Sequence, residues 1–320
     1  MMYSEKKLVV SHAPFWHDGG SLSARHYNIM LAALIPVIAG FVTYGVPAVG
    51  VVALSISCAI LWELLMNKVM RRPVSIGDGN AALIGLLLAM LMPATMPWWA
   101  VLIGTFVAIV IAKQIFGGLG ANPFNPVLIS VAILMASWPQ FFDFNYMLAN
   151  YDTGFAMAYP LGSAKYFGAS SVAAFTPAAL LMGKQSGGIG TTFGLGVIIG
   201  GVYLMLRGYI RWEIAVSFLA GVFVTALLFN KFGGQQYAGP VFHLLTGYTL
   251  IGAFFLATED SSSPVNLLPM FIYGAAGGVL TVLIRNIGVY VDGVVYAILI
   301  VNLVNPLVDK IRPKALGRAA

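Results

Sequence analysis

The sequence predicts an all-α integral membrane protein of about ten transmembrane helices, arranged as two inverted five-helix repeats with interrupted helices. The first observation is composition: 59% of the 320 residues are hydrophobic and 9% are charged, whereas about a quarter of a soluble domain is charged. The second is the recurrence of apolar runs of roughly twenty residues, the length that crosses a hydrocarbon core of about 30 Å. The third is a weak internal repeat.

Ten apolar segments fit transmembrane spans along the chain. They lie at roughly 27–45, 48–68, 81–93, 98–116, 125–138, 193–207, 213–230, 241–257, 266–284 and 289–307. Tryptophans stand at several span ends, where aromatic anchors are typical.

Two of these spans are irregular. The third ends in MPATMPWW, in which Pro93 and Pro97 leave a short helix and a turn. The fifth is preceded by GGLGANPFNP at 117–126. Backbone without helical hydrogen bonds is tolerated at membrane depth only when it is buried in protein or lines a polar cavity. A tight cytoplasmic turn is the plain alternative for 117–126.

The internal repeat relates spans of opposite direction. NAALIGLLLAMLMP (80–93) resembles GYTLIGAFFLATED (247–260), and LGANPFNPVLISVAIL (119–134) resembles IGVYVDGVVYAILIV (287–301). These partners are the third and eighth spans and the fifth and tenth. Inverted repeats of this kind place interrupted helices and a site near their interface.

The repeat and the loops divide the chain into five parts. They are an N-terminal segment 1–26, a first repeat 27–138, a loop 139–192, a second repeat 193–309 and a basic tail 310–320.

The distribution of basic residues predicts the orientation. Ten spans put both termini on one side of the membrane, and cytoplasmic termini place thirteen of the 17 Lys and Arg residues inside. The four outside are Lys165, Lys184, Lys231 and Arg285. Loop 139–192, with Thr176, is therefore expected on the outer face. The first 24 residues lack a long apolar core, so we expect no cleaved signal peptide.

The sequence lacks the motifs of several classes of chemistry. The single cysteine, Cys58, provides neither a disulfide framework nor a cysteine-ligated cluster. Of four histidines, His243 alone lies near a span interior, so a pair of haem ligands on facing spans is missing. There is no Walker loop, HExxH motif or Ser-His-Asp set, and the basic residues are spread over loops, which does not favour nucleic-acid binding. The residues alone leave open a solute transporter or channel and a membrane redox subunit.

Carboxylates near the membrane are few, and most fall at predicted span ends. They are Glu63, Asp78, Glu213, Glu259, Asp260 and Asp292. An intramembrane carboxylate is a functional candidate because a charge in lipid is costly. A solvated or salt-bridged interfacial position is the alternative for each. Asp292, close to Asn125 in the repeat alignment, is our candidate for ion coupling.

Longer stretches resemble a known family. Residues 82–129, ALIGLLLAMLMPATMPWWAVLIGTFVAIVIAKQIFGGLGANPFNPVLI, closely resemble the core of the D subunit of the Rnf complex. This family is homologous to the B subunit of the sodium-pumping NADH:quinone oxidoreductase (the RnfD/NqrB family). FHLLTGYTLIGAFFLATED (242–260), LIRNIGVYVDGVVYAILIVNLVNPLVD (283–309) and KIRP (310–313) also fit. The resemblance covers nearly the whole chain.

The resemblance implies a component of an ion-motive ferredoxin:NAD⁺ oxidoreductase in a bacterial or archaeal plasma membrane. Such complexes couple electron flow between ferredoxin and NAD⁺ to Na⁺ or H⁺ translocation. The implied partners are the other Rnf subunits (A, B, C, E and G) and a flavin transferase. The implied cofactors are FMN, joined to a threonine by a phosphoester bond on the outer face, and noncovalent riboflavin in the membrane core. Gly118, Asn122 and Asn125 are then candidate wall residues for riboflavin.

The resemblance assigns Thr176 as the FMN acceptor. The family's attachment motif approximates Asp-x-x-Ser/Thr-Gly-Ala-Thr followed by Pro, and the sequence here reads SSVAAFTP at 170–177. Ser170 replaces Asp, Ala173 replaces Ser or Thr, Ala174 replaces Gly, and Phe175 replaces the Ala before the acceptor. Phe175 is expected to stack on the flavin ring. The plain alternative is a helix start, capped by Ser170 or Ser171 or initiated at Thr176–Pro177.

Two interpretations without redox chemistry also remain. The inverted-repeat fold resembles that of urea-transporter-like channels, so the cavity between the halves could conduct a solute. The chain could also be a structural subunit of the complex. The sequence does not distinguish Na⁺ from H⁺.

Overall fold

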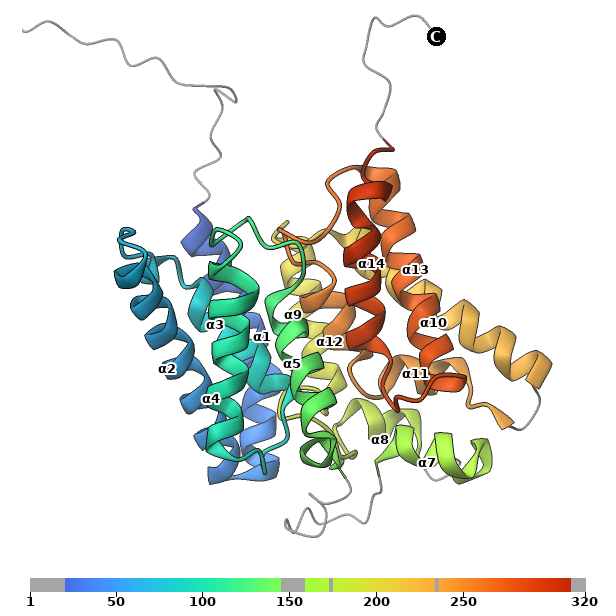
Figure 1. Cartoon of the computed structure of the whole chain (residues 1–320). Coiled ribbons are helices and arrows are strands. Elements are labelled where there is room, and N and C mark those ends of the chain that lie inside the picture. Colours follow the sequence, from blue (N-terminus) through green and yellow to red (C-terminus); the bar gives the residue numbers. More distant parts are fainter. Residues whose placement is uncertain (1–20, 145–158, 173–174, 234–235, 312–320) are drawn as a thin grey trace, which may run out of the picture.

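The computed structural model describes residues 21–144, 159–172, 175–233 and 236–311. This part of the chain is helical and contains no strand, which confirms the predicted all-α class. The helices stand side by side in one bundle, and the start of α1 and the end of α14 lie at the same end of it (Figure 1). The predicted segments 1–26 and 310–320 fall mostly outside the described residues.

Four helices are long and apolar enough to cross a membrane. They are α1 (Leu22–Tyr44), α2 (Val46–Val69), α10 (Trp212–Gly233) and α13 (Leu267–Asn286). They coincide with the first, second, seventh and ninth predicted spans. The protein is therefore a multi-pass membrane protein.

Five further apolar segments form shorter helices. They are α3 (Asn80–Leu91), α4 (Trp98–Phe106) continued by the π-helix η2 (Val107–Gln114), α5 (Pro126–Ser137), α9 (Gly194–Leu206) and α14 (Val294–Val308). The 12 residues of α3 span about 18 Å, less than a hydrocarbon core of about 30 Å. That ten segments cross the membrane remains a prediction.

The eighth predicted span is broken near its middle. It consists of α11 (Pro240–Leu245), α12 (Thr249–Ile251) and the π-helix η6 (Gly252–Leu256). At the break Gly247 has φ +62°, a backbone conformation that residues with a Cβ atom rarely adopt. The Tyr248 hydroxyl donates to the Leu91 carbonyl at the end of α3, at 2.7 Å. Two short helices from distant parts of the chain are thus joined inside the bundle, but the inverted repeat itself remains a prediction.

The remaining helices are short and connect the longer ones. They are η1 (Ile76–Asp78), η3 (Pro139–Phe142), α7 (Pro160–Phe167), η4 (Ala169–Val172) and α8 (Pro177–Leu181). The last four belong to the predicted loop 139–192. Helices α7, α8 and α11 lie together at the end of the bundle away from the start of α1 (Figure 1), and α8 contacts α11.

Candidate functional site

Thr176 stands at the start of α8 and its side chain is exposed. Its Oγ1 accepts a hydrogen bond from Ala179 N at 3.3 Å, and Pro177 occupies the first helical position. This is the helix start that was the plain alternative for the segment. Because the hydroxyl only accepts in this bond, its proton is not committed to it, and the oxygen is accessible for modification.

The residues around Thr176 are only partly described. Phe175 is half-buried and packs against the hydrophobic core. Ser170 is exposed, while Ala173 and Ala174 lie outside the described residues. The stacking of Phe175 on a flavin and the attachment at Thr176 both remain predictions.

The segment that carries Thr176 is tied to α11. Gln185, which follows α8, is buried, and its amide nitrogen donates to the carbonyls of Leu180, Thr192 and Leu245 at 3.1–3.2 Å. Leu180 on α8 is also buried. These bonds hold the end of α8 against the end of α11, where the eighth span breaks.

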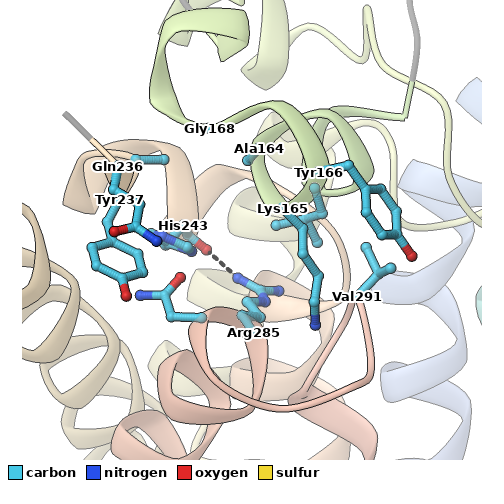
Figure 2. Close-up of a pocket in the computed structure, with 12 residues that line it drawn as sticks. Ala164, Lys165, Tyr166, Gly168, Gln236, Tyr237, His243, Arg285 and Val291 are labelled. Carbon is cyan, nitrogen blue, oxygen red and sulfur yellow. Dashed lines mark hydrogen bonds between the residues drawn. The ribbon is translucent and has the colours of Figure 1, made fainter. Parts of the chain in front are cut away.

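A cavity of about 280 Å³ lies beside α11. Figure 2 shows Lys165 of α7, His243 of α11 and Arg285 of α13 around this cavity, with Tyr237 and Tyr166 at the two flanks. The full lining is Leu161, Ala164, Lys165, Tyr166, Gly168, Gln236, Tyr237, Ala238, His243, Arg285, Asn286 and Val291.

Two cationic side chains line this cavity. Arg285 is buried; it forms an ion pair of 2.9 Å with Asp292 and donates to the carbonyls of His243 (2.8 Å) and Thr246 (3.2 Å). Lys165 donates to the carbonyls of Gly288 (2.7 Å) and Tyr290 (2.6 Å) and makes no ion pair with any carboxylate in the described part of the chain. Burial lowers the pKa of Lys165 from its ordinary value. With Asp292 balancing Arg285, the cavity has an excess of one positive charge while Lys165 is protonated.

Three buried nitrogens at the cavity have no hydrogen-bond partner among the described residues. They are Nδ1 and Nε2 of His243, a residue only 2% exposed, and Nδ2 of Asn286. Buried polar groups are nearly always hydrogen-bonded, because a buried group that loses its hydration and gains no hydrogen bond destabilises the folded state. The cavity thus offers donors and an acceptor to a polar ligand.

Asp292, the candidate for ion coupling, is buried and fully engaged. Besides its ion pair with Arg285, it accepts hydrogen bonds from Tyr248 N at 2.7 Å and Val294 N at 3.2 Å. It therefore links the break of the eighth span to the start of α14. This is a salt-bridged position, though a buried rather than an interfacial one; ion coupling through Asp292 remains a prediction.

A second cavity, of about 440 Å³, adjoins Asp292. Its walls are largely aromatic and include Phe142, Phe144, Tyr159, Tyr166, Tyr248 and Tyr290. Tyr166 and Val291 line both cavities.

The structure does not bring Gly118, Asn122 and Asn125 to Thr176. Asn125 caps α5 and donates to the Leu256 carbonyl at 2.9 Å, while Asn122 contacts Glu259 Oε1 at 3.3 Å. This segment lies at the end of the bundle where α1 begins, and α7 and α8 lie at the other end (Figure 1). Gly118 has φ +98°, as a glycine turn requires. A riboflavin site at these residues remains a prediction.

The cavity residues were not predicted from the sequence. Lys165 and Arg285 were counted only for topology, and His243 only for the missing haem ligands. One signal was present: Arg285 directly follows the predicted span 266–284 and precedes Asp292 by seven residues. Ionisable residues next to or within the membrane are functional candidates.

Comparison with known proteins gives a match over nearly the entire chain. A family model described as the NQR2, RnfD, RnfE family matches residues 9–317. The chain belongs to this family. The resemblance to RnfD and NqrB is thereby confirmed.

Individual relatives are similar to this chain over nearly their full length, and each is named as the D subunit of an ion-translocating complex. The chain is 36% identical over 310 residues to the D subunit of the proton-translocating ferredoxin:NAD(+) oxidoreductase complex of Clostridium ljungdahlii, covering 95% of this chain and 94% of that protein. It is 34% identical over 308 residues to the Na(+)-translocating counterpart of Acetobacterium woodii, covering 96% and 94%. It is 32% identical over 349 residues to the D subunit of the ion-translocating oxidoreductase complex of Cronobacter sakazakii, covering 96% and 98%.

Proposed function

We propose that this chain is the D subunit of an ion-translocating ferredoxin:NAD⁺ oxidoreductase complex and that it carries FMN covalently on Thr176. The observation that carries the first part is the similarity over nearly the full length to proteins of that name. Electron entry and exit would belong to the partner subunits (A, B, C, E and G). The proposal covers either H⁺ or Na⁺ as the coupled ion, because one relative is named for protons and another for sodium.

The FMN assignment is supported by the accessibility of Thr176. Its oxygen is exposed at the start of α8, and α8 is anchored through Gln185, so an attached group would be held near one place on the protein. FMN bound there supplies the ability to exchange one or two electrons with a neighbouring redox centre. The residues of this chain orient the group and set the charge around it.

The outward position of Thr176 is consistent with the distribution of basic residues. Thirteen of 17 lysines and arginines fall on the proposed cytoplasmic side. A flavin transferase acting at the outer face would then have access to α8. Coupling to ion movement requires that an ion site or gate differ in free energy between the oxidised and reduced flavin.

The test is flavin fluorescence of the protein on a denaturing gel after co-expression with the flavin transferase. We expect a fluorescent wild type, a dark Thr176→Ala variant and an intact mass increased by one FMN phosphoester. Ser163→Ala is the matched control, because it removes another partly exposed hydroxyl of the same loop outside the attachment motif. It should stay fluorescent.

Other results would change the assignment. Fluorescence that persists in Thr176→Ala would move the acceptor elsewhere. A dark wild type that still purifies with the other subunits would indicate a structural role or noncovalent flavin. A colourless protein that conducts a solute would favour the channel.

A further inference from the structure

The C-terminal end of α2 carries a groove on the surface of the bundle that changes from apolar to basic along its length. Its volume is about 480 Å³, and it is lined by Leu61, Leu64, Leu65, Lys68, Arg72 and Val74, all of them exposed. The first four of these residues recur three to four positions apart, so they lie on one face of the helix. This end of α2 lies at the end of the bundle where α1 begins (Figure 1).

The turn after α2 holds Arg71 in a conformation that favours glycine. Its φ is +54°, and no other non-glycine residue in the described ranges has a left-handed φ. Arg72 N donates to the Asn67 carbonyl at 2.8 Å and Arg71 N donates to the Lys68 carbonyl at 3.2 Å, a pair of bonds that usually closes a helix with glycine in the left-handed position. The chain therefore carries a basic side chain where the backbone alone favours glycine, and such conformations gather at functional sites.

A hydrogen bond to another segment holds Arg72 beside the groove. Its Nη1 donates to the Gly117 carbonyl at 2.8 Å. A guanidinium group has five N–H donors, and this is the only hydrogen bond of the Arg72 side chain within the described part of the chain. The other donors are available to a ligand with several acceptor oxygens.

The cations at this end of α2 are not balanced by carboxylates. None of the ion pairs between described residues includes Lys68, Arg71 or Arg72. A positive charge near the last carbonyls of a helix is favourable in itself, which is the plain explanation for Lys68. That explanation accounts neither for the exposed leucines that continue the same face nor for the left-handed Arg71.

A phospholipid with an anionic headgroup has the matching order of surfaces. In a multi-pass membrane protein the end of a long apolar helix lies near the headgroups, and its exposed apolar face contacts the acyl chains. Phosphate oxygens form strong hydrogen bonds with lysine and arginine side chains. A zwitterionic lipid has the same chains and phosphate but no net charge, so unbalanced cations favour an anionic lipid.

From these observations we propose that the groove at the end of α2 binds one anionic phospholipid, with its phosphate between Lys68 and Arg72 and its acyl chains along the three leucines. The bound headgroup then joins the end of α2 to the segment around Gly117 through Arg72. The proposal adds a lipid-binding site to this chain and does not depend on the flavin.

The test is a lipid titration of the full chain, delipidated in detergent, with bound lipids counted by native mass spectrometry. Wild type should bind phosphatidylglycerol more tightly than phosphatidylcholine with identical chains. The double variant Lys68→Gln with Arg72→Gln should bind phosphatidylglycerol about 25-fold more weakly, since each cation near the headgroups contributes about fivefold. Lys68→Arg with Arg72→Lys retains both charges and should retain most of the affinity. If the double variant does not fold, Lys68→Gln alone keeps the Arg72 bond to Gly117 and should bind about fivefold more weakly.

The matched control is Arg207→Gln with Lys310→Gln, which removes two exposed charges of the predicted cytoplasmic side outside the groove. It should bind phosphatidylglycerol as wild type does, and the melting temperature of each variant without lipid reports whether it is folded. Equal affinity of wild type for the two lipids would overturn the proposal. Unchanged phosphatidylglycerol binding in the folded Lys68→Gln variants, or an equal loss in the control, would overturn it as well. Unchanged lipid binding together with loss of a partner subunit from the assembled complex would show that the groove is a protein contact instead.

Discussion

At the scale of single residues, two buried ion pairs distinguish this chain from a simple bundle of apolar helices. Lys113 of η2 lies 2.7 Å from Glu63 of α2, and both side chains are almost fully buried. Ser75 also donates to Glu63 at 2.7 Å. Removing one member of such a pair leaves a buried charge without compensation, which costs far more than the pair itself contributes.

We therefore predict that Lys113→Ala destabilises the protein by about 3–5 kcal/mol. Thermal unfolding of the purified protein in detergent should show a large fall in melting temperature. The double variant Glu63→Gln with Lys113→Met removes both charges and should melt well above the single variant. Asp260→Asn is the matched control, because its partner Arg25 and Asp260 itself are partly exposed, and such pairs contribute about 0–1 kcal/mol. Equal losses of stability in Lys113→Ala and Asp260→Asn would show that burial does not increase the contribution of the Lys113–Glu63 pair to stability.

These pairings could not be read from the sequence. Glu63 and Asp292 were placed near span ends, where a carboxylate is ordinarily solvated. Their burial depends on which helices pack together, and Glu63 meets a lysine 50 residues away. For His243 the sequence indicated a position near a span interior, which remains a prediction. The structure shows that the residue is buried in α11 and that both of its ring nitrogens lack a partner among the described residues, which the sequence did not indicate.

At the scale of elements, glycines allow α10 and α13 to pack closely. A Cβ at Gly278 of α13 would meet the Phe218 carbonyl of α10, and one at Gly274 would meet Ser217. Small residues at helix interfaces are typical of membrane proteins, where close backbone approach replaces much of the hydrophobic driving force.

We predict that Gly278→Ala weakens this contact by about 1–3 kcal/mol, the range for overpacking a filled interface. Gly50→Ala is the matched control, since a Cβ at Gly50 of α2 meets no atom within 4 Å. Alanine there should be neutral or stabilising by up to about 1 kcal/mol through helix propensity. Both can be compared by melting temperature in the same detergent. A neutral Gly278→Ala would mean that the two helices separate easily.

The elements also show where sequence signals sufficed. Prolines at 93 and 97 predicted the early end of α3, and Met92 is indeed extended there. The break in the eighth span was not located, because Thr246-Gly247-Tyr248 contains one glycine in an otherwise apolar run. The left-handed conformation of Gly247 and the hydrogen bonds of Tyr248 to Leu91 and Asp292 together explain why the chain bends there.

At the scale of the whole molecule, the ends of the described chain and the segment carrying Thr176 lie at opposite ends of the bundle (Figure 1). Composition and apolar length predicted the class of fold, because they reflect the solvent around the protein rather than any particular contact. Which end faces the cytoplasm depends on the charges of the loops, thirteen of 17 on one side. The bundle and the charge distribution together lead to a single arrangement that can be tested.

We predict that Ser170 is accessible from outside the cell and Lys310 is not. Cys58 is the single cysteine and is buried, so a Cys58→Ala background provides a protein without thiols at modest cost. Ser170→Cys and Lys310→Cys can then be introduced separately, since both positions are accessible to some degree. A membrane-impermeant maleimide applied to intact cells should label the Ser170 variant alone, and both variants after solubilisation. Labelling of the Lys310 variant alone in intact cells would reverse the topology, and Thr176 would then lie out of reach of a transferase acting at the outer face. Labelling of both would place the two positions on the same side, which is incompatible with their location at opposite ends of the bundle.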